Sequence, residues 1–237
     1  MTAPAGNLKP VRSGTAAEAW GRLLAQQPVW TPRGESLVVL STHPGEETLG
    51  AGGLIASYRQ WHRPVTIVSI TDGEAAYPGW QDLADIRRAE LVHALHRLCA
   101  EGLTIVRLSL PDGQVGRHER ALREALLALL PSGSLLVAPF EDDGYPDHAT
   151  VGRMACSVAG TLEVRVARYP LWLWQYSGVH SAAGLRWGRF LLDERLRELK
   201  AHAVDALASL RQPPAGAPLL AAESLAHFDR PFEAFIL

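Results

Sequence analysis

The sequence predicts an α/β protein in which a mostly parallel, doubly wound sheet carries helices on both faces within one domain. The first supporting observation is an alternation of short apolar runs with helical patterns of about 10 to 15 residues, which is typical of βαβ units. The second is size, because 237 residues with 47% hydrophobic content suffice for one large core. The third is that neither an internal repeat nor a linker divides the sequence.

The expected strands are short runs of apolar and β-branched residues bounded by turn-forming residues. The run over 36–41 is almost wholly apolar, and the run over 65–70 is rich in β-branched residues, so both predict buried strands. A last strand is expected in the final residues of the sequence. The six runs lie at 36–41, 65–70, 104–108, 135–139, 164–169 and 233–237.

The expected helices have apolar residues spaced three and four positions apart. In the helix predicted over 16–26, Trp20, Leu23 and Leu24 share one side. The helix predicted over 191–210 has an apolar stripe typical of a packed outer helix. The sequence divides into an N-terminal arm and helix over 1–34 and a main domain over 35–237. The six helical patterns lie at 16–26, 47–61, 82–98, 119–130, 148–159 and 191–210.

The composition argues against several classes of function. A net charge of −2 and a pI near 6.5 provide no field that favours nucleic acid or an anionic membrane. No apolar run approaches the ~20 residues of a membrane helix, and residues 1–10 lack a secretory signal. Cys99 and Cys156 lack C-x-x-C spacing, as buried reduced thiols do. We therefore expect a cytoplasmic protein, with its oligomeric state open.

Metal-ligating residue types follow two of the expected strands. His43 and Glu46 come directly after the strand over 36–41, and His148 comes after the strand over 135–139. Because parallel strands end at the same edge of a sheet, these side chains are expected to converge there. Two His and one carboxylate form a common catalytic zinc set, which lowers the pKa of a water to ~7. A Glu in the first turn of a helix also serves simply as a partner of the helix dipole.

Four ordered segments between Leu37 and Trp174 carry a family resemblance. The segment His43-Pro44-x-x-Glu47-Thr48-Leu49-Gly50-x-Gly52-Gly53 resembles the His-Pro-Asp-Asp-Glu signature of PIG-L/LmbE-like zinc N-deacetylases. Tyr169–Trp174 is in addition similar to a segment of some bacterial members. The other three matches to the family's motifs are Thr71-Asp72-Gly73-Glu74, Arg87-Arg88-Ala89-Glu90 and Tyr145-Pro146-Asp147-His148.

The resemblance implies a Rossmann-like fold, a zinc or other divalent ion, and hydrolysis of an N-acetyl group on a small amino-sugar-like substrate. His43 matches the first zinc ligand of the family and His148 the last. Glu46 stands where the family has its carboxylate ligand, and Glu47 is expected to support the ligands. An alternative is a catalytically impaired member that binds a sugar-like ligand or acts as a regulatory protein.

Glu46 keeps the carboxylate of the family's second Asp on a side chain one methylene longer, and two other positions depart more seriously from the family's motifs. Gly45 stands where the family has its general-base Asp, and general-base catalysis typically contributes about 10²–10⁴-fold. Tyr145 stands where the family has a His, and a Tyr with a pKa of about 10 is a poor proton shuttle. Three explanations stay open: Glu46 or Glu47 acts as the base, the substrate or Asp147 transfers the proton, or catalysis has been lost.

The remaining candidates each have a structural alternative. Asp147 either orients a proton-transfer group or caps the helix that follows. Asp72 and Glu74 either bind substrate or form a turn, and Arg87 either binds substrate or pairs with its helix neighbour Glu90.

Three further features of the sequence bear on ligand binding. Trp172 is either a core residue or a pocket wall suited to a sugar. Asp112 is interpreted as a turn residue. Neither a phosphate-binding loop nor G-x-G-x-x-G follows the first strand, so nucleotide binding is disfavoured.

Overall fold

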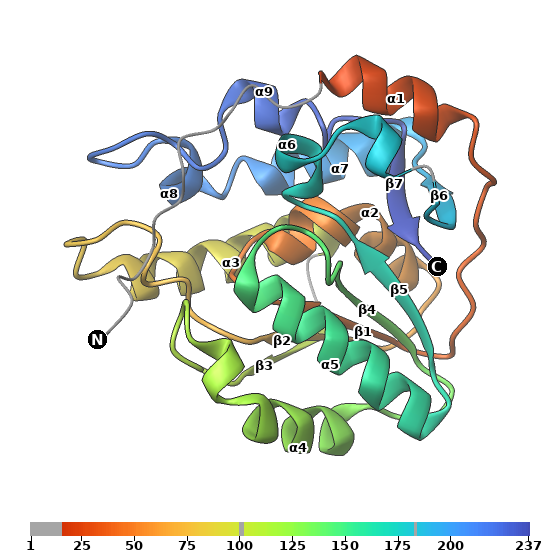
Figure 1. The fold of residues 1–237 in the computed structure, drawn as a ribbon, viewed down its shortest axis with the longest axis horizontal. Coiled ribbons are helices and arrows are strands. Elements are labelled where there is room, and N and C mark those ends of the chain that lie inside the picture. The colour runs from red at the N-terminus through yellow and green to blue at the C-terminus, as the bar shows by residue number, and fades with distance from the viewer. Residues whose placement is uncertain (1–15, 100–101, 183) are drawn as a thin grey trace.

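A computed structural model describes residues 16–99, 102–182 and 184–237, and its centre is a seven-stranded sheet (Figure 1). The strand order is β3-β2-β1-β4-β5-β7-β6, in which β1 to β5 are parallel and β7 runs antiparallel to both of its neighbours. The predicted fold class is therefore confirmed. The strands are β1 Leu37–Ser41, β2 Val65–Ser69, β3 Leu103–Arg107, β4 Leu135–Pro139, β5 Arg165–Tyr169, β6 Trp187–Leu191 and β7 Phe232–Ile236.

Helices cover both faces of the sheet, with α4 and α5 on one side and α2, α3 and α7 packed together on the other (Figure 1). Short 3₁₀ turns occur at Val115–Arg117 and Val179–Ala182. The α-helices are α1 Ala17–Ala25, α2 Glu46–Gln60, α3 Leu83–Cys99, α4 Glu119–Leu129, α5 Pro146–Leu162, α6 Leu173–Tyr176, α7 Glu194–Val204, α8 Ala208–Arg211 and α9 Ala222–Leu225.

The central strand shows why these runs are apolar throughout. Leu37 and Val39 of β1 belong to the core under α2, α3 and α7, whereas Val38 and Leu40 belong to the core under α4 and α5. Successive side chains of a strand point to opposite faces, so a strand covered on both faces needs apolar residues at every position. Trp20 of α1 packs in a third cluster with Trp174 and other residues.

The single helix predicted over 191–210 is wrong. Leu191 ends β6, and the Asp193 side chain accepts a hydrogen bond from the backbone N–H of Leu196, which caps the start of α7 at Glu194. The apolar stripe predicted one continuous helix, but α7 ends at Val204 and α8 begins at Ala208. Residues 1–15, the first part of the N-terminal arm and helix predicted over 1–34, lie outside the described residues.

Helix α2 is interrupted near its middle. Ala51 has a non-helical φ of −142°, which divides the helix into two parts, and the first N–H groups of a helical segment have no acceptor within that segment. The Glu233 carboxylate of β7 accepts both of these N–H groups, at 2.7 and 2.9 Å, and also lies 2.7 Å from Nζ of Lys200. A strand from the far end of the sequence thus caps the second half of α2.

The sheet topology brings two loops together. Strand β1 pairs in parallel with both β2 and β4, and the chain leaves β1 toward β2. The loops after β1 and β4 therefore open at the same sheet edge, at the point where the strand order reverses. In the part of the chain that the structure describes, no helix combines the length and apolar character needed to cross a bilayer.

Candidate metal centre and cleft

The loop after β1 is held by buried hydrogen bonds. The Ser41 hydroxyl donates to the Glu47 carboxylate at 2.7 Å, and the backbone N–H of Gly45 donates to the same oxygen at 3.0 Å. The other Glu47 oxygen accepts from the Thr48 hydroxyl. Burial raises the pKa of Glu47. The Glu47 side chain therefore ties β1 to the start of α2 and lies outside the cleft described below.

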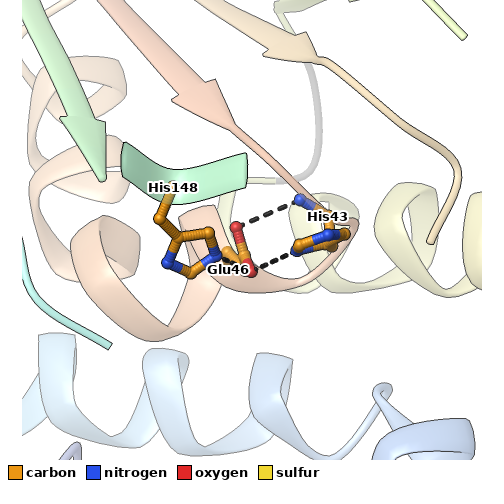
Figure 2. Close-up of side chains that lie close together, drawn as sticks. All are labelled: His43, Glu46 and His148. Atoms are coloured by element: carbon orange, nitrogen blue, oxygen red, sulfur yellow. Dashed lines mark hydrogen bonds and ion pairs between the residues drawn. The ribbon is translucent and has the colours of Figure 1, made fainter. Parts of the chain in front are cut away.

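The side chains of His43, in the loop after β1, and of His148, in the first turn of α5, meet at one carboxylate oxygen of Glu46, the first residue of α2 (Figure 2). Nδ1 of His43 lies 2.7 Å from Oε1 of Glu46, and Nε2 of His148 lies 2.8 Å from the same oxygen. Their potential ligand atoms all lie within 4.8 Å of one another. Each of the three residues is buried, His148 completely.

The outer nitrogen of each imidazole faces a second carboxylate. Nε2 of His43 lies 2.9 Å from Oδ1 of Asp112, and Nδ1 of His148 lies 2.8 Å from Oδ2 of Asp143. Carboxylates in this position fix the tautomer and orientation of a ligating His, as in carboxylate–histidine–zinc sites. Such an arrangement leaves the inner nitrogens free to face one point beside Glu46. The donor set therefore fits a divalent ion such as zinc.

The charges of the cluster support this fit. Burial opposes charging of the imidazoles, but Glu46 and the outer carboxylates outweigh it, so the pKa of His43 is raised to about 9 and that of His148 to about 10. Burial also opposes ionisation of Glu46, yet the two imidazoles lower its pKa below the usual range. The site thus concentrates negative charge that protons compensate, and a cation can replace those protons.

Sequence reasoning missed Asp112 and Asp143. Asp143 is completely buried and accepts hydrogen bonds from the backbone N–H groups of Leu171, Trp172 and Leu173. Because it binds His148 as well, Asp143 joins the metal centre to the segment that leads into α6. Its position among three consecutive acidic residues after β4 was the available signal.

A cleft opens beside the metal centre, with about 650 Å³ of empty space counted out to its open mouth. One end is polar, and most of the remaining wall is apolar. The polar lining residues are His43, Glu46, Arg87, Asp112, Tyr145 and Gln175. The apolar lining residues are Leu49, Ala76, Leu171, Trp172, Leu210, Leu219, Leu220 and Phe228.

Tyr145 covers the two imidazoles from the cleft side. Its ring centroid lies 5.4 Å from that of His43 and 5.3 Å from that of His148. Burial, reinforced by nearby carboxylates such as Asp112 and Asp147, raises the pKa of its hydroxyl. The hydroxyl is therefore protonated at neutral pH and available as a hydrogen-bond donor.

Asp147 and Glu74 both hold the loop that carries Asp112. The Asp147 carboxylate accepts from the backbone N–H groups of Gly113 and Val115, at 2.8 and 3.2 Å, and burial raises its pKa. Exposed Glu74 accepts from the backbone N–H of Asp112 at 2.9 Å. Asp147 thus binds the neighbouring loop, and one of its oxygens lies within 4.8 Å of ligand atoms of His43 and Asp112.

Arg87 is buried and lines the cleft. Its guanidinium donates to the carbonyl oxygens of Gly73 and Pro44, at 2.9 and 3.0 Å, and so clamps the loops after β2 and β1 together. Glu90 binds Ser209 of α8 through two hydrogen bonds. The surface ion pair considered for Arg87 and Glu90 is therefore not the arrangement observed.

The other candidate substrate-binding residues differ in position. Trp172 is half-buried and lines the cleft. Asp72 lies outside the cleft lining and pairs with Arg88 at 3.0 Å. Glu74 also lies outside the lining.

Gly45 has a left-handed backbone and is packed against a side chain. Its φ is +100°, and a Cβ added there would lie 2.9 Å from Cδ2 of Leu207. Leu207, between α7 and α8, therefore fills the space that a side chain at position 45 would enter.

The fold and the site together define a class of protein. An open, mostly parallel α/β sheet carries a two-His, one-carboxylate cluster at its switch point, where α/β proteins bind ligands, and this donor set fits a divalent ion. A sequence model of the PIG-L family, described as GlcNAc-PI de-N-acetylase, matches residues 38–159, which is just over half of the chain. The chain belongs to the PIG-L family, as the sequence motifs predicted.

Solved structures with the same fold include proteins of different activities. The conserved protein TT1542 from Thermus thermophilus is 26% identical, with a TM-score of 0.54 over 72% of this chain and 77% of that one. The zinc-inhibited form of teicoplanin deacetylase Orf2 is 17% identical, with a TM-score of 0.60 over 85% and 97%.

A hydratase has this fold too. GalB, the 4-carboxy-2-hydroxymuconate hydratase from Pseudomonas putida, is 14% identical, with a TM-score of 0.53 over 85% of this chain and 94% of that one. The fold therefore hosts more than one reaction, and activity has to be argued from the site. A search of curated proteins finds no significant match.

Proposed function

We propose that this protein is a metal-dependent N-deacetylase, with zinc as the expected ion, that hydrolyses an N-acetyl group on a small amino-sugar-like molecule. The observation that carries the proposal is the meeting of His43, Glu46 and His148 at the polar end of an open cleft. Membership of the PIG-L family supports the reaction and the sugar-like substrate.

His43, Glu46 and His148 would hold the ion, and Asp112 and Asp143 would orient the two imidazoles. When bound, a divalent ion supplies Lewis acidity toward an acyl carbonyl and lowers the pKa of water. The Tyr145 hydroxyl faces the same end of the cleft as a protonated donor, so we assign it to the oxyanion that develops on the carbonyl.

The proton acceptor is the altered part of this site. Glu47 and Asp147 lie outside the cleft lining, and we assign both of them to holding the loops. Glu46 and Asp112 are the carboxylates that line the cleft. Because Glu46 is needed as a ligand, we assign proton acceptance to Asp112. His43 and other hydrogen-bond partners hold the pKa of Asp112 low despite its burial, so this base is weak and turnover is expected to be slow.

Substrate recognition would fall to the other cleft residues. Arg87 presents a buried guanidinium at the polar end, and Trp172 presents an aromatic face suited to a sugar ring. Asp72 and Glu74 lie outside the lining, so we assign them to supporting the loops through Arg88 and Asp112.

Metal content and acetate release together test this proposal. Protein purified without chelator or a His-tag is expected to contain about one equivalent of a divalent ion and to release acetate from members of an N-acetylated sugar panel. His148→Ala should lose both properties, whereas exposed His93→Ala in α3 should keep both. Absence of any bound ion, even after zinc is added, would contradict the proposal.

A second candidate is a family member that binds its ligand without hydrolysing it. Leu207 favours this candidate, because its side chain occupies the space that a side chain at position 45 would enter. Bound metal without acetate release would support it. In that case Gly45→Asp alone should stay inactive, and Gly45→Asp combined with Leu207→Ala, which makes room for the carboxylate, should restore hydrolysis.

A further inference from the structure

The apolar wall of the cleft comes from a different part of the chain than its polar end. Residues 38–159, which match the PIG-L family model, supply the metal centre and every polar lining residue except Gln175. Most of the apolar wall comes from segments that follow β5. The lining residues there are Leu171, Trp172, Leu210, Leu219, Leu220 and Phe228. What this wall binds is therefore set by residues outside the family match.

Hydrogen bonds to other elements hold the wall in place. The Glu90 carboxylate of α3 accepts from the backbone N–H and the hydroxyl of Ser209, at 2.7 and 2.6 Å, and so fixes α8, which carries Leu210. The Tyr77 hydroxyl accepts from the backbone N–H of Leu219 at 3.0 Å. Both sides of the segment between α8 and α9 are thus anchored, while its leucine side chains line the cleft.

The apolar wall carries no cation. Among the described residues, Arg87 is the only Arg or Lys that lines the cleft, and it lies at the polar end with Glu46 and Asp112. A phosphate or carboxylate placed along the wall would therefore meet no opposite charge. Sugar hydroxyls would not suit it either, because hydroxyls held against apolar side chains lose hydrogen bonds to water. An uncharged apolar group avoids both costs and gains free energy from burial.

We propose that the substrate is an amphiphile, in which the N-acylated amino sugar at the metal centre is joined to an uncharged apolar group that lies along this wall. The inference rests on the amide hydrolysis proposed above and names the part of the substrate that the apolar residues bind. The cleft has about 650 Å³ of empty space out to its mouth, within the range of about 300–1,000 Å³ that holds drug-sized ligands. The apolar group has two possible points of attachment, as the aglycone of the sugar or as an N-acyl chain longer than acetyl.

Three glycosides that differ in one eight-carbon chain test the inference with the metal-loaded protein. They are methyl N-acetyl-β-glucosaminide, octyl N-acetyl-β-glucosaminide and methyl N-octanoyl-β-glucosaminide, each used below its micelle concentration. If acetate or octanoate is released, kcat/KM compares the three. If neither is released, isothermal titration gives the Kd of each, because no ligand is consumed. Failure of the proposed hydrolysis therefore leaves this inference testable.

One of the two compounds with an eight-carbon chain is expected to exceed the methyl N-acetyl compound in kcat/KM or affinity by at least about tenfold, because each buried methylene adds to binding. A preference for the octyl glycoside would assign the wall to the aglycone. A preference for the octanoyl amide would assign it to the acyl chain.

Leu219→Gln locates the preference on the wall. Leu219 is half-buried and lines the cleft, and its replacement should lower the preference for the eight-carbon chain by at least about threefold. The matched control is Leu191→Gln, which changes a half-exposed leucine at the end of β6, outside the lining, and should keep the preference. The preference is a ratio measured within one preparation, so a loss of folded protein does not alter it.

The comparison in the original protein decides the matter even if a variant fails to fold. Equal kcat/KM or equal Kd for the three glycosides, or no measurable binding of any of them, would overturn the inference. So would a preference that stays unchanged in folded Leu219→Gln.

Discussion

The contact between Gly45 and Leu207 makes a quantitative prediction about Gly45→Ala. A non-glycine residue at a φ of +100° costs about 1–3 kcal/mol in backbone strain. The new Cβ would also lie 2.9 Å from Cδ2 and 3.0 Å from Cδ1 of Leu207, and such overpacking costs about 1–3 kcal/mol more. We expect Gly45→Ala to lower the free energy of unfolding by about 2–6 kcal/mol.

Gly79 provides the matched control for the backbone term. Its φ is +90°, and nothing lies within 4 Å of the Cβ that an alanine would add there. Gly79→Ala should therefore cost only the backbone part, about 1–3 kcal/mol. Urea unfolding of both variants, under conditions where the original protein unfolds in two states, measures the difference.

A double-mutant cycle with Leu207→Ala isolates the contact itself. Removing the Leu207 side chain relieves the clash, so Gly45→Ala and Leu207→Ala together should destabilise less than the sum of the two, by about 1–3 kcal/mol. Strict additivity, or equal costs at positions 45 and 79, would refute the view that Leu207 occupies the place of a side chain at position 45.

Three further predictions concern buried carboxylates and a histidine. Asp143→Asn should weaken metal affinity about 10–100-fold by equilibrium dialysis, while exposed Asp142→Asn should not. The folded protein holds the pKa of His227 near 4, below its ordinary value of 6.5, so the unfolded chain takes up the proton first as pH falls from 6.5 toward 4. The free energy of unfolding should therefore drop by up to about 3 kcal/mol over that range. His227→Gln should make the free energy of unfolding less dependent on pH there, and an unchanged slope would count against this reasoning. Glu233→Gln should cost about 3–5 kcal/mol in urea unfolding because Lys200 stays buried without a counter-charge, and a loss below 1 kcal/mol would contradict this.

The parts of the structure that the sequence predicted are those set by local patterns. Strands β1 and β4 are buried on both faces, so their apolar runs predicted them almost to the residue. The proposed ligands His43, Glu46 and His148 followed from residue type and position at two strand ends. Parallel pairing of β1 with β4 then brings those ends together.

The features that the sequence did not predict depend mostly on contacts between residues far apart in the chain. Asp112 lies 69 residues from His43 in the sequence, and nothing in a turn-like Asp-Gly pair indicates such a partner. Leu207 looked like one more apolar residue of a continuous helix, although its contact with Gly45 decides what position 45 can hold. Strand β6 ends in half-exposed Leu191, whose apolar side chain extended the helical pattern of the next segment.

The cap that Glu233 places on α2 has a consequence for the order in which the protein matures during translation. The N–H groups of Gly53 and Leu54 donate to Glu233, which is synthesised 180 and 179 residues after them. At about 5–20 residues per second, that wait lasts about 10–40 s on the ribosome. The helix that begins with Glu46 is therefore among the first elements synthesised and among the last completed. A nascent chain stalled before β7 would carry the loop of His43 next to a helix whose second half is not yet capped.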